Sequence, residues 1–350
     1  QILQSLPQAI QTMLDPADCG PACLSLCQDV QGETFEYPEE FFKERIHNIR
    51  RPKPDDFQIK QAVEKIKNSK NPIIISGGGV FYSDAMEELS NFAVKHNIPV
   101  TQTVMGYSTM KRDHSHFVGP IGGLGGKAAN NLAKETDLAI CIGTKLADFT
   151  TGSWANFENP QFKLVSINIA RHDANKHLAE AVIGDAKVSL IELSNALGDW
   201  RSSDSWHKKS QDELKSWNEY VDKESGPTNQ ELPSYAHAVG AIYRNSDPTD
   251  IAVTAAGGLV GEVVQVWRPK ELNTHETEWG FSCMSYEISG ALGIKMANPD
   301  KDVIAFVGDG SYLLNNSDIY SSVLTNNKLI IIVCDNGGHA VINRLQLFKG

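Results

Sequence analysis

The chain has 350 residues, of which 41% are hydrophobic and 21% are charged, a balance typical of a soluble protein with two or more hydrophobic cores. Its formal net charge of −11 argues against nucleic-acid and anionic-membrane partners, because phosphate surfaces would repel it. The longest apolar run, Leu329 to Cys334, is far shorter than the roughly 18 residues of a membrane span, so we expect a soluble, cytoplasmic protein.

Two polar, proline-bearing connectors divide the chain. The first covers residues 37–56, and the second covers residues 199–230 and contains one predicted surface helix from Asp212 to Tyr220. The units that these connectors separate are residues 1–36, 57–198 and 231–350.

Residues 57–198 alternate short β-branched runs with helix-period segments, which is typical of a parallel sheet covered by helices on both faces. Right-handed crossovers make a doubly wound α/β domain the simplest topology. The predicted strands are Ile73–Ser76, Val100–Thr103, Leu138–Ile142 and Leu164–Ile167, and the predicted helices begin near Asp84, Lys127 and Ala186.

Residues 231–350 start a second alternation of the same α/β kind. The predicted strands are Ile251–Thr254, Val303–Val307 and Leu329–Cys334, with helices near Cys283–Met296 and Asn316–Thr325. Three strands are too few for a satisfactory sheet, so we expect this unit to be truncated at its C-terminus. The start at Gln1 likewise suggests a longer natural protein.

The six cysteines are few for this length, which fits a reducing cytoplasm. Cys19, Cys23 and Cys27 recur every fourth residue, but no nearby histidine or Cys-x-x-Cys pair supports a metal site. We therefore expect these thiols to be buried as small hydrophobic groups.

Two glycine-rich stretches open predicted helices in the second unit: Gly77–Gly79, after a strand, and Gly122–Gly126, before Lys127. Backbone amides at such a turn could face a phosphate. The first stretch lacks the G-x-G-x-x-G spacing and an acidic residue at the end of the second strand, and the second is equally unspecific. Tight turns are the favoured interpretation, and a nucleotide site is the alternative.

The segment Gly308-Asp309-Gly310-Ser311 directly follows an apolar strand, at the carboxyl end where parallel sheets bind ligands. A helix and a further buried strand lead to Asp335-Asn336-Gly337-Gly338. A right-handed strand-helix-strand unit places two such strand ends side by side. Asp309 and Asn336 are therefore expected to converge.

These residues suit a magnesium–diphosphate site. Magnesium takes oxygen ligands in octahedral geometry, usually one or two carboxylates together with phosphate oxygens. Asp309 offers a carboxylate, Asn336 an amide oxygen, and Gly338 a carbonyl that a glycine turn can point inward. We predict these three as metal ligands; the alternative is a strand-ending turn followed by a helix cap.

The two segments resemble the fingerprint of the thiamine-diphosphate-dependent enzymes, which is Gly-Asp-Gly followed some two dozen residues later by Asn-Asn. Here 24 residues separate Gly310 from Asp335. Asp335 replaces the first asparagine, while Asn336 keeps the second position, which binds the metal in that family.

Other segments are similar to the same family. Gly257, Gly258 and Leu259 fall where its cofactor domain first meets the diphosphate, and Met284 matches the apolar residue that wedges beneath the cofactor. Ser285 stands where relatives usually have glycine. The resemblance implies thiamine diphosphate and Mg²⁺ as cofactors, held by Gly257, Gly258, Leu259, Ser282, Cys283, Met284, Gly308, Asp309, Gly310, Ser311, Asn336 and Gly338.

The resemblance also assigns the units. Residues 1–36 correspond to the end of the amino-terminal pyrimidine-binding domain, with Gln4–Val30 as its last helix and strand, residues 57–198 to the central Rossmann-like domain, and residues 231–350 to the diphosphate-binding domain. The family's activating glutamate lies in the first domain.

That assignment implies that the chain carries no catalytic residue and is inactive alone. Glu276, Glu278 and Glu287 lie in the wrong domain to replace the activating glutamate. Because the family builds each site across two subunits, a homodimer or homotetramer is expected at full length.

A narrower resemblance points to the branch of the family that acts in myo-inositol catabolism, and rests on Leu14–Pro21, Asp335–Gly338 and Ile342–Gln346. It implies a carbon–carbon bond hydrolase that opens trihydroxycyclohexane-1,2-dione, the small-molecule substrate, to 5-deoxyglucuronate. An acetolactate-synthase-like carboligase, a non-catalytic nucleotide-binding module and a degenerate regulatory homologue remain alternatives. His275 and His339 lie near cofactor segments, but packing or surface roles are commoner for histidine.

Overall fold

Two parallel β-sheets with flanking helices make up the computed structural model, which describes residues 1–349. The strands are β1 (Pro72–Ser76), β2 (Val100–Gln102), β3 (Phe117–Pro120), β4 (Leu138–Ile142), β5 (Lys163–Asn168), β6 (Glu180–Ile183), β7 (Ile251–Thr254), β8 (His275–Thr277), β9 (Val303–Gly308) and β10 (Ile330–Cys334). One sheet has six strands in the order β3-β2-β1-β4-β5-β6, and the other has four in the order β10-β9-β7-β8. The predicted α/β class is confirmed.

Helices connect successive strands. The α-helices are α1 (Ile2–Leu14), α2 (Asp56–Lys67), α3 (Gly79–Tyr82), α4 (Met86–His96), α5 (Lys127–Glu135), α6 (Asp148–Thr151), α7 (Arg171–Ala174), α8 (Ala186–Leu197), α9 (Asp204–Glu224), α10 (Tyr235–Asn245), α11 (Leu259–Val266), α12 (Tyr286–Ala297), α13 (Asp309–Leu314), α14 (Asp318–Leu324) and α15 (Ala340–Lys349). Short 3₁₀ turns are η1 (Val30–Gly32), η2 (Glu39–Phe42), η3 (Val104–Gly106) and η4 (Lys176–Leu178). Within residues 1–349, no helix combines the length and apolarity needed to cross a membrane.

The six-stranded sheet is doubly wound, with its switch point between β1 and β4. The four strands predicted here form within one residue of their expected bounds. The sequence did not predict β3 and β6, which lie at the two edges of the sheet. Edge strands do not need the continuous apolar run that marks a central strand, and β6 is only partly buried.

Alternation along β1 builds the two layers of the central core. Ile74 packs with Phe92 of α4 and Leu190 of α8 on one face, while Ile73 and Ile75 pack with Leu132 of α5 on the other. Every residue of β1 is buried. A strand covered on both faces in this way is typical of parallel α/β sheets.

The four-stranded sheet carries a separate core. Ala252 and Ile304 face α10 and α11, whereas Val253 and Ala305 face α12. Its three predicted strands are confirmed, and β8, only three residues long, was missed. β10 forms the edge of this sheet and is only partly buried.

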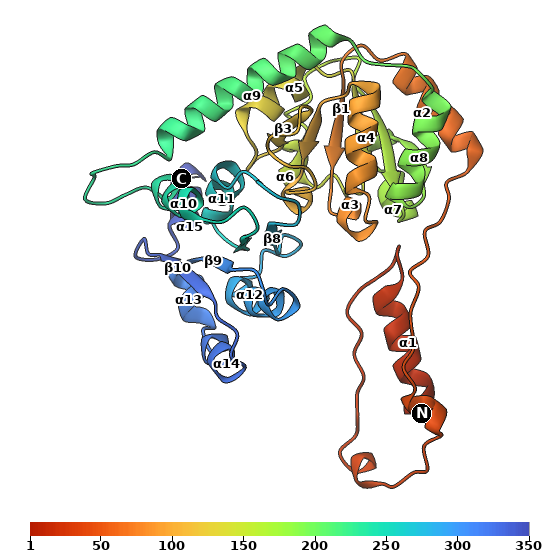
Figure 1. Ribbon diagram of the computed structural model, residues 1–350, viewed down its shortest axis with the longest axis vertical. Coiled ribbons are helices and arrows are strands. Elements are labelled where there is room, and N and C mark those ends of the chain that lie inside the picture. The colour runs from red at the N-terminus through yellow and green to blue at the C-terminus, as the bar shows by residue number, and fades with distance from the viewer. Residues whose placement is uncertain (350) are drawn as a thin grey trace.

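Helix α9 lies where the second connector was predicted. It is 21 residues long, more than the Asp212–Tyr220 helix expected, and Ser203 caps its start by accepting from the Trp206 N–H. Trp206 is buried in the central core and its indole N–H donates to the Pro72 carbonyl at 2.8 Å. Val221, four turns later, packs into the core of the four-stranded sheet. Figure 1 shows α9 running along the outer edge of the central domain, past α5, toward α10 of the other domain.

The first 50 residues extend away from both sheets (Figure 1). The helix expected after Gln4 is present as α1, but none of its residues is buried. The strand expected before Val30 is wrong, because residues 15–29 form turns and irregular backbone with no neighbouring strand to pair with. Burial of Cys19, Cys23 and Cys27 was also wrong: all three are exposed, because nothing in residues 1–349 packs over this segment.

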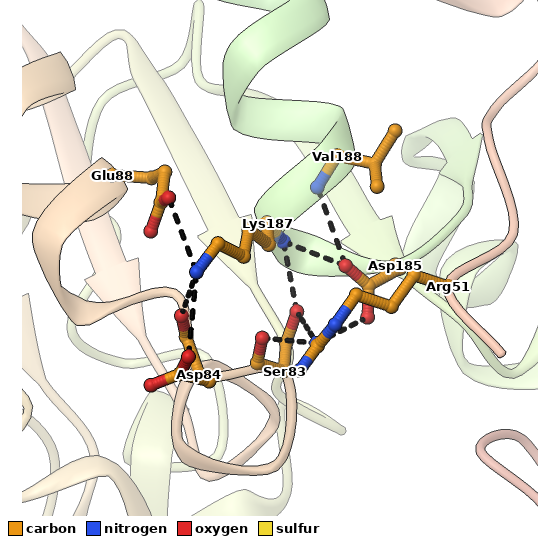
Figure 2. Close-up of polar contacts among 7 residues, drawn as sticks. All are labelled: Arg51, Ser83, Asp84, Glu88, Asp185, Lys187 and Val188. Atoms are coloured by element: carbon orange, nitrogen blue, oxygen red, sulfur yellow. Dashed lines mark hydrogen bonds and ion pairs between the residues drawn. The ribbon is translucent and has the colours of Figure 1, made fainter. Parts of the chain in front are cut away.

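The first connector is fastened to the central domain just before α2, as Figure 2 shows. The Arg51 guanidinium donates to the Ser83 carbonyl and lies 3.2 Å from the Asp185 carboxylate. Asp185 is nearly buried and caps α8 by accepting from the N–H groups of Lys187 and Val188. Its own N–H donates to the Pro52 carbonyl at 2.9 Å. The connector is therefore held by both charge and backbone bonds.

We expect Asp185→Ala to lower the free energy of unfolding of the central domain by about 2 kcal/mol, because it removes a helix cap and leaves Arg51 without its carboxylate. Asp185→Asn should cost less, since asparagine still caps the helix. Urea unfolding followed by tryptophan fluorescence measures both. Asp84→Asn is the control, because asparagine also tolerates the left-handed backbone at this position (φ +51°). Asp84 pairs with Lys187 at 3.3 Å but is 74% exposed, so loss of its charge should leave stability unchanged.

Candidate functional site

The candidate site lies at the carboxyl edge of the four-stranded sheet. β9 and β10 pair in parallel, with Gly308 opposite Cys334. Asp309 and Asp335 therefore leave the sheet from adjacent positions, and Asn336 follows one residue later. The two predicted metal-binding segments thus emerge side by side.

Close contact at Gly310 joins three of the predicted segments. A Cβ placed on Gly310 would lie 2.7 Å from His339 Cε1 and 3.5 Å from Met284 Cε. The histidine ring therefore occupies the space that a side chain would need, and the Met284 methyl group reaches the same point. A side chain at Gly310 would force the exposed His339 ring to move, whereas Gly308 faces open space.

Asn336 is oriented by a residue far away in sequence. Its amide NH₂ donates to the hydroxyl of Tyr235 at the start of α10, which leaves its carbonyl oxygen for another ligand. Asp335 closes the turn by accepting from the Gly337 N–H at 2.9 Å. Gly337 and Gly338 have φ angles of +76° and +146°, in the region that favours glycine.

The oxygen donors fit a hard divalent cation. Asp309 supplies a partly exposed carboxylate, Asn336 a free amide oxygen and Gly338 a backbone carbonyl. Over residues 1–349 no three His, Cys, Asp or Glu side chains gather at one point, so a cation at this edge would need additional oxygens from a ligand. A diphosphate provides them.

The loop after β7 forms the second side of the edge. Gly257 has a φ of +78°, and Gly258 precedes Leu259, the first residue of α11. The carboxylate of Glu287 accepts from the Ala256 N–H at 3.2 Å and is 1% exposed. Burial raises the pKa of Glu287. The buried Glu287 carboxylate therefore fixes this loop through its hydrogen bond to Ala256.

The segment leading to Met284 contains two strained positions. Ser282 and Ser285 have φ angles of +53° and +76°. The Ser285 hydroxyl donates to the Ser311 carbonyl at 2.6 Å, which ties this segment to the one after β9. The left-handed backbone at Ser285 explains why the resembled family usually has glycine at this position. The hydrogen bond to Ser311 offsets the strain that serine adds there.

Packing accounts for the glycine-rich stretches of the central domain. A Cβ on Gly79 would lie 2.6 Å from the Gly143 Cα, and one on Gly126 would lie 2.7 Å from the Trp217 Nε1. Gly122 has a φ of +105° and its Cα lies against the Phe149 carbonyl. These glycines permit close approach of neighbouring backbone atoms and, at Gly126, of the Trp217 ring, which supports the interpretation as tight turns.

The two histidines near the edge differ in environment. His275 is buried beneath Tyr107 of the central domain, with ring centroids 5.2 Å apart, and burial lowers its pKa to about 3. It stays neutral and packs the two domains together. His339 is exposed and covers Gly310.

Tyr235 was not predicted from the sequence, and Glu278 and Glu287 were considered only as replacements for the activating glutamate and rejected. The tyrosine lies 101 residues before Asn336, so no local pattern joins them. Glu278 accepts from the N–H groups of Phe281 and Cys283. Both carboxylates accept hydrogen bonds from loop N–H groups. The sequence signals this role only by placing the two glutamates next to the predicted cofactor segments.

Comparison with known proteins gives matches on both sides of α9. Residues 59–193 match the family described as thiamine pyrophosphate enzyme, central domain, and residues 255–350 match its C-terminal TPP binding domain.

Curated relatives match the whole chain. Proteins named 3D-(3,5/4)-trihydroxycyclohexane-1,2-dione hydrolase are 38% identical over 374 residues in Bacillus anthracis, 36% over 373 in Clostridium perfringens and 38% over 377 in Clostridium tetani. Each alignment covers 100% of this chain and 58% of the relative, so the chain spans less than two thirds of their length.

Ser285→Ala should lower the free energy of unfolding of the four-stranded domain by about 1–2 kcal/mol, because it loses the bond to Ser311 and keeps the left-handed strain. Ser285→Gly loses the same bond but relieves the strain, so it should be nearly neutral. Thermal unfolding of the two variants compares them. Equal losses would show that strain contributes nothing at this position.

Gly310→Ala should destabilise the domain by about 0.5–1.5 kcal/mol, because its methyl group would force the exposed His339 ring out of its position. In a His339→Ala background the same change should be neutral or stabilising, since alanine favours helix α13. Gly308→Ala, which meets open space, is the matched control. Unfolding midpoints of the four variants test the contact, and a Gly310→Ala cost that persists without the ring would contradict it.

Proposed function

Since the chain belongs to the thiamine pyrophosphate enzyme family, we propose that it is the cofactor-holding part of a thiamine-diphosphate-dependent hydrolase that opens the ring of a cyclic 1,2-dione. The observation that supports this most directly is the parallel pairing of β9 with β10, from which Asp309 and Asn336 emerge at one edge. The names of the relatives supply the reaction class.

In this proposal Asp309, Asn336 and Gly338 hold Mg²⁺, and the backbone of Gly257, Gly258 and Gly310 gives a diphosphate close access. Tyr235 orients Asn336 through its amide NH₂. The remaining cofactor contacts come from Leu259, Ser282, Cys283, Met284, Gly308 and Ser311. When bound, thiamine diphosphate supplies a nucleophilic carbon able to attack a carbonyl group.

The reaction consumes one water. The bond between the two adjacent carbonyl carbons breaks, the water hydroxyl goes to one carbon to give a carboxylate, and hydrogen goes to the other to give an aldehyde. From trihydroxycyclohexane-1,2-dione the product is 5-deoxyglucuronate, as in inositol catabolism. Substrate and product are polar metabolites, so a cytoplasmic setting fits.

Turnover belongs to the whole protein in this proposal. The chain spans 58% of its relatives' length, and we assign the activating glutamate to residues outside it and the working unit to a homodimer or homotetramer. Glu287 does not replace that glutamate, because it is buried and engaged with the Ala256 N–H.

Two other functions make different predictions. An acetolactate-synthase-like carboligase would share the cofactor and join keto acids, whereas a nucleotide-binding module would bind through Gly77–Gly79. The packing of Gly79 against Gly143 gives those glycines a structural role and so favours the enzyme. Incubating the full-length protein with pyruvate and with the cyclic dione separates the enzymes, since acetolactate without ring opening would contradict the proposal.

Calorimetric titration of the full-length protein with thiamine diphosphate should give binding that depends on Mg²⁺ and is lost with a chelator. Asp309→Ala should weaken binding at least about 100-fold, since even the loss of a group that only orients a metal ligand costs about 10–100-fold. Asp335→Asn is the matched control: asparagine can still accept from the Gly337 N–H, so affinity should stay within about 3-fold. Absence of Mg²⁺-dependent heat, or an equal loss in both variants, would refute the site.

A further inference from the structure

Residues 280–284 form an exposed turn that follows Trp279, a residue packed against Val260 and Val264. Within the turn, the Ser282 hydroxyl donates one long bond, of 3.5 Å, to the Ala255 carbonyl. Phe281 is 90% exposed and Met284 is 37% exposed. In the part of the chain that the structure describes, none of the N–H groups of residues 279–283 donates to a backbone carbonyl. A turn with neither buried apolar groups nor backbone bonds is expected to be mobile unless a side chain fixes it.

Glu278 provides that fixation. Its Oε1 accepts from the Phe281 N–H at 2.8 Å and its Oε2 accepts from the Cys283 N–H at 2.6 Å. One carboxylate thus spans the turn with both oxygens. Burial raises the pKa of Glu278, but the N–H groups outweigh this effect and hold it below its ordinary value, so the group stays ionised.

Only a group with two acceptors meets this requirement. In a Glu278→Gln variant the carbonyl oxygen could still accept one N–H, but the NH₂ group would face the other N–H, donor against donor. Hydrogen bonds to a charged acceptor are also roughly twice as strong as those to a neutral one. Glutamine is therefore a near-isosteric side chain that cannot close the turn.

The turn places Met284 at the carboxyl edge of the four-stranded sheet, next to Gly310. Met284 Cε lies 3.5 Å from the Cβ position of Gly310, and the next residue, Ser285, bonds the Ser311 carbonyl. The bonds of Glu278 lie on one side of Met284 and the bond of Ser285 on the other. The position of Met284 thus depends on both ends of the segment.

We propose that Glu278 is a positioning residue. Its carboxylate accepts hydrogen bonds from the Phe281 and Cys283 amides and thereby holds Met284 in place to support the bound cofactor. This inference rests on the proposed function, in which Met284 contacts the cofactor. Glu278 makes no contact with substrate in it and transfers no proton.

Hydrogen exchange of the full-length protein without cofactor tests the two hydrogen bonds that Glu278 accepts. Glu278→Gln should speed exchange of the Phe281 and Cys283 amides by at least about 10-fold, the factor expected for lost bonds to a charged acceptor. The β9 amides should exchange as in the wild type. Glu276→Gln, an equal loss of charge at an exposed residue outside the turn, should leave the turn unchanged. Wild-type exchange in Glu278→Gln, or equally faster exchange in β9, would overturn the proposal.

A double-mutant cycle tests the route through Met284. Glu278→Gln should weaken thiamine diphosphate binding roughly 10-fold and change the circular dichroism signal of the bound cofactor. In a Met284→Ala background the same change should cost less than in the wild type, because only Ser282 and Cys283 then remain for the Glu278 bonds to position. Additive losses would overturn the proposal. The wild-type titration comes first and tests the proposed function separately, since exchange in the turn needs no cofactor.

Discussion

Parallel pairing between β9 and β10 is the constraint on which the candidate site depends. This pairing fixes the register of the two strands, so that Gly308 and Cys334 lie opposite each other. The two loops that follow therefore start side by side at the carboxyl edge of the sheet. A shift of one residue would turn the side chains of β10 to the other face and separate Asp309 from Asn336. The burial of Phe306 and Val307 on opposite faces of β9 opposes such a shift in its neighbour.

Around that edge, the loops are held chiefly by hydrogen bonds that involve side chains. Tyr235 holds Asn336, Asp335 closes the Gly337 turn and Glu287 supports Ala256. Each of these bonds satisfies a polar group in a loop that lacks regular secondary structure. The site is therefore assembled by polar contacts on a scaffold that the apolar cores make rigid.

The central strands could be predicted from sequence because apolar runs such as Ile73–Ile75 must be covered on both faces. β3, β6 and β8 could not, because short strands at or near an edge carry no such run. The convergence of the β9 and β10 loops followed from crossover handedness, which is a local rule. The roles of Tyr235 and Glu278 depend on folded geometry, and no spacing in the chain encodes them.

Helix α9 has a consequence for domain motion. Its 21 residues make a rod of about 30 Å, with Trp206 embedded near one end and Val221 near the other. Because a helix resists stretching, the two domains cannot separate along the axis of α9 while both of its ends stay packed in their cores. Relative movement of the domains would also have to break the contacts between them, which include the Tyr107–His275 pair and the apolar cluster of Val104 with Val260 and Val264.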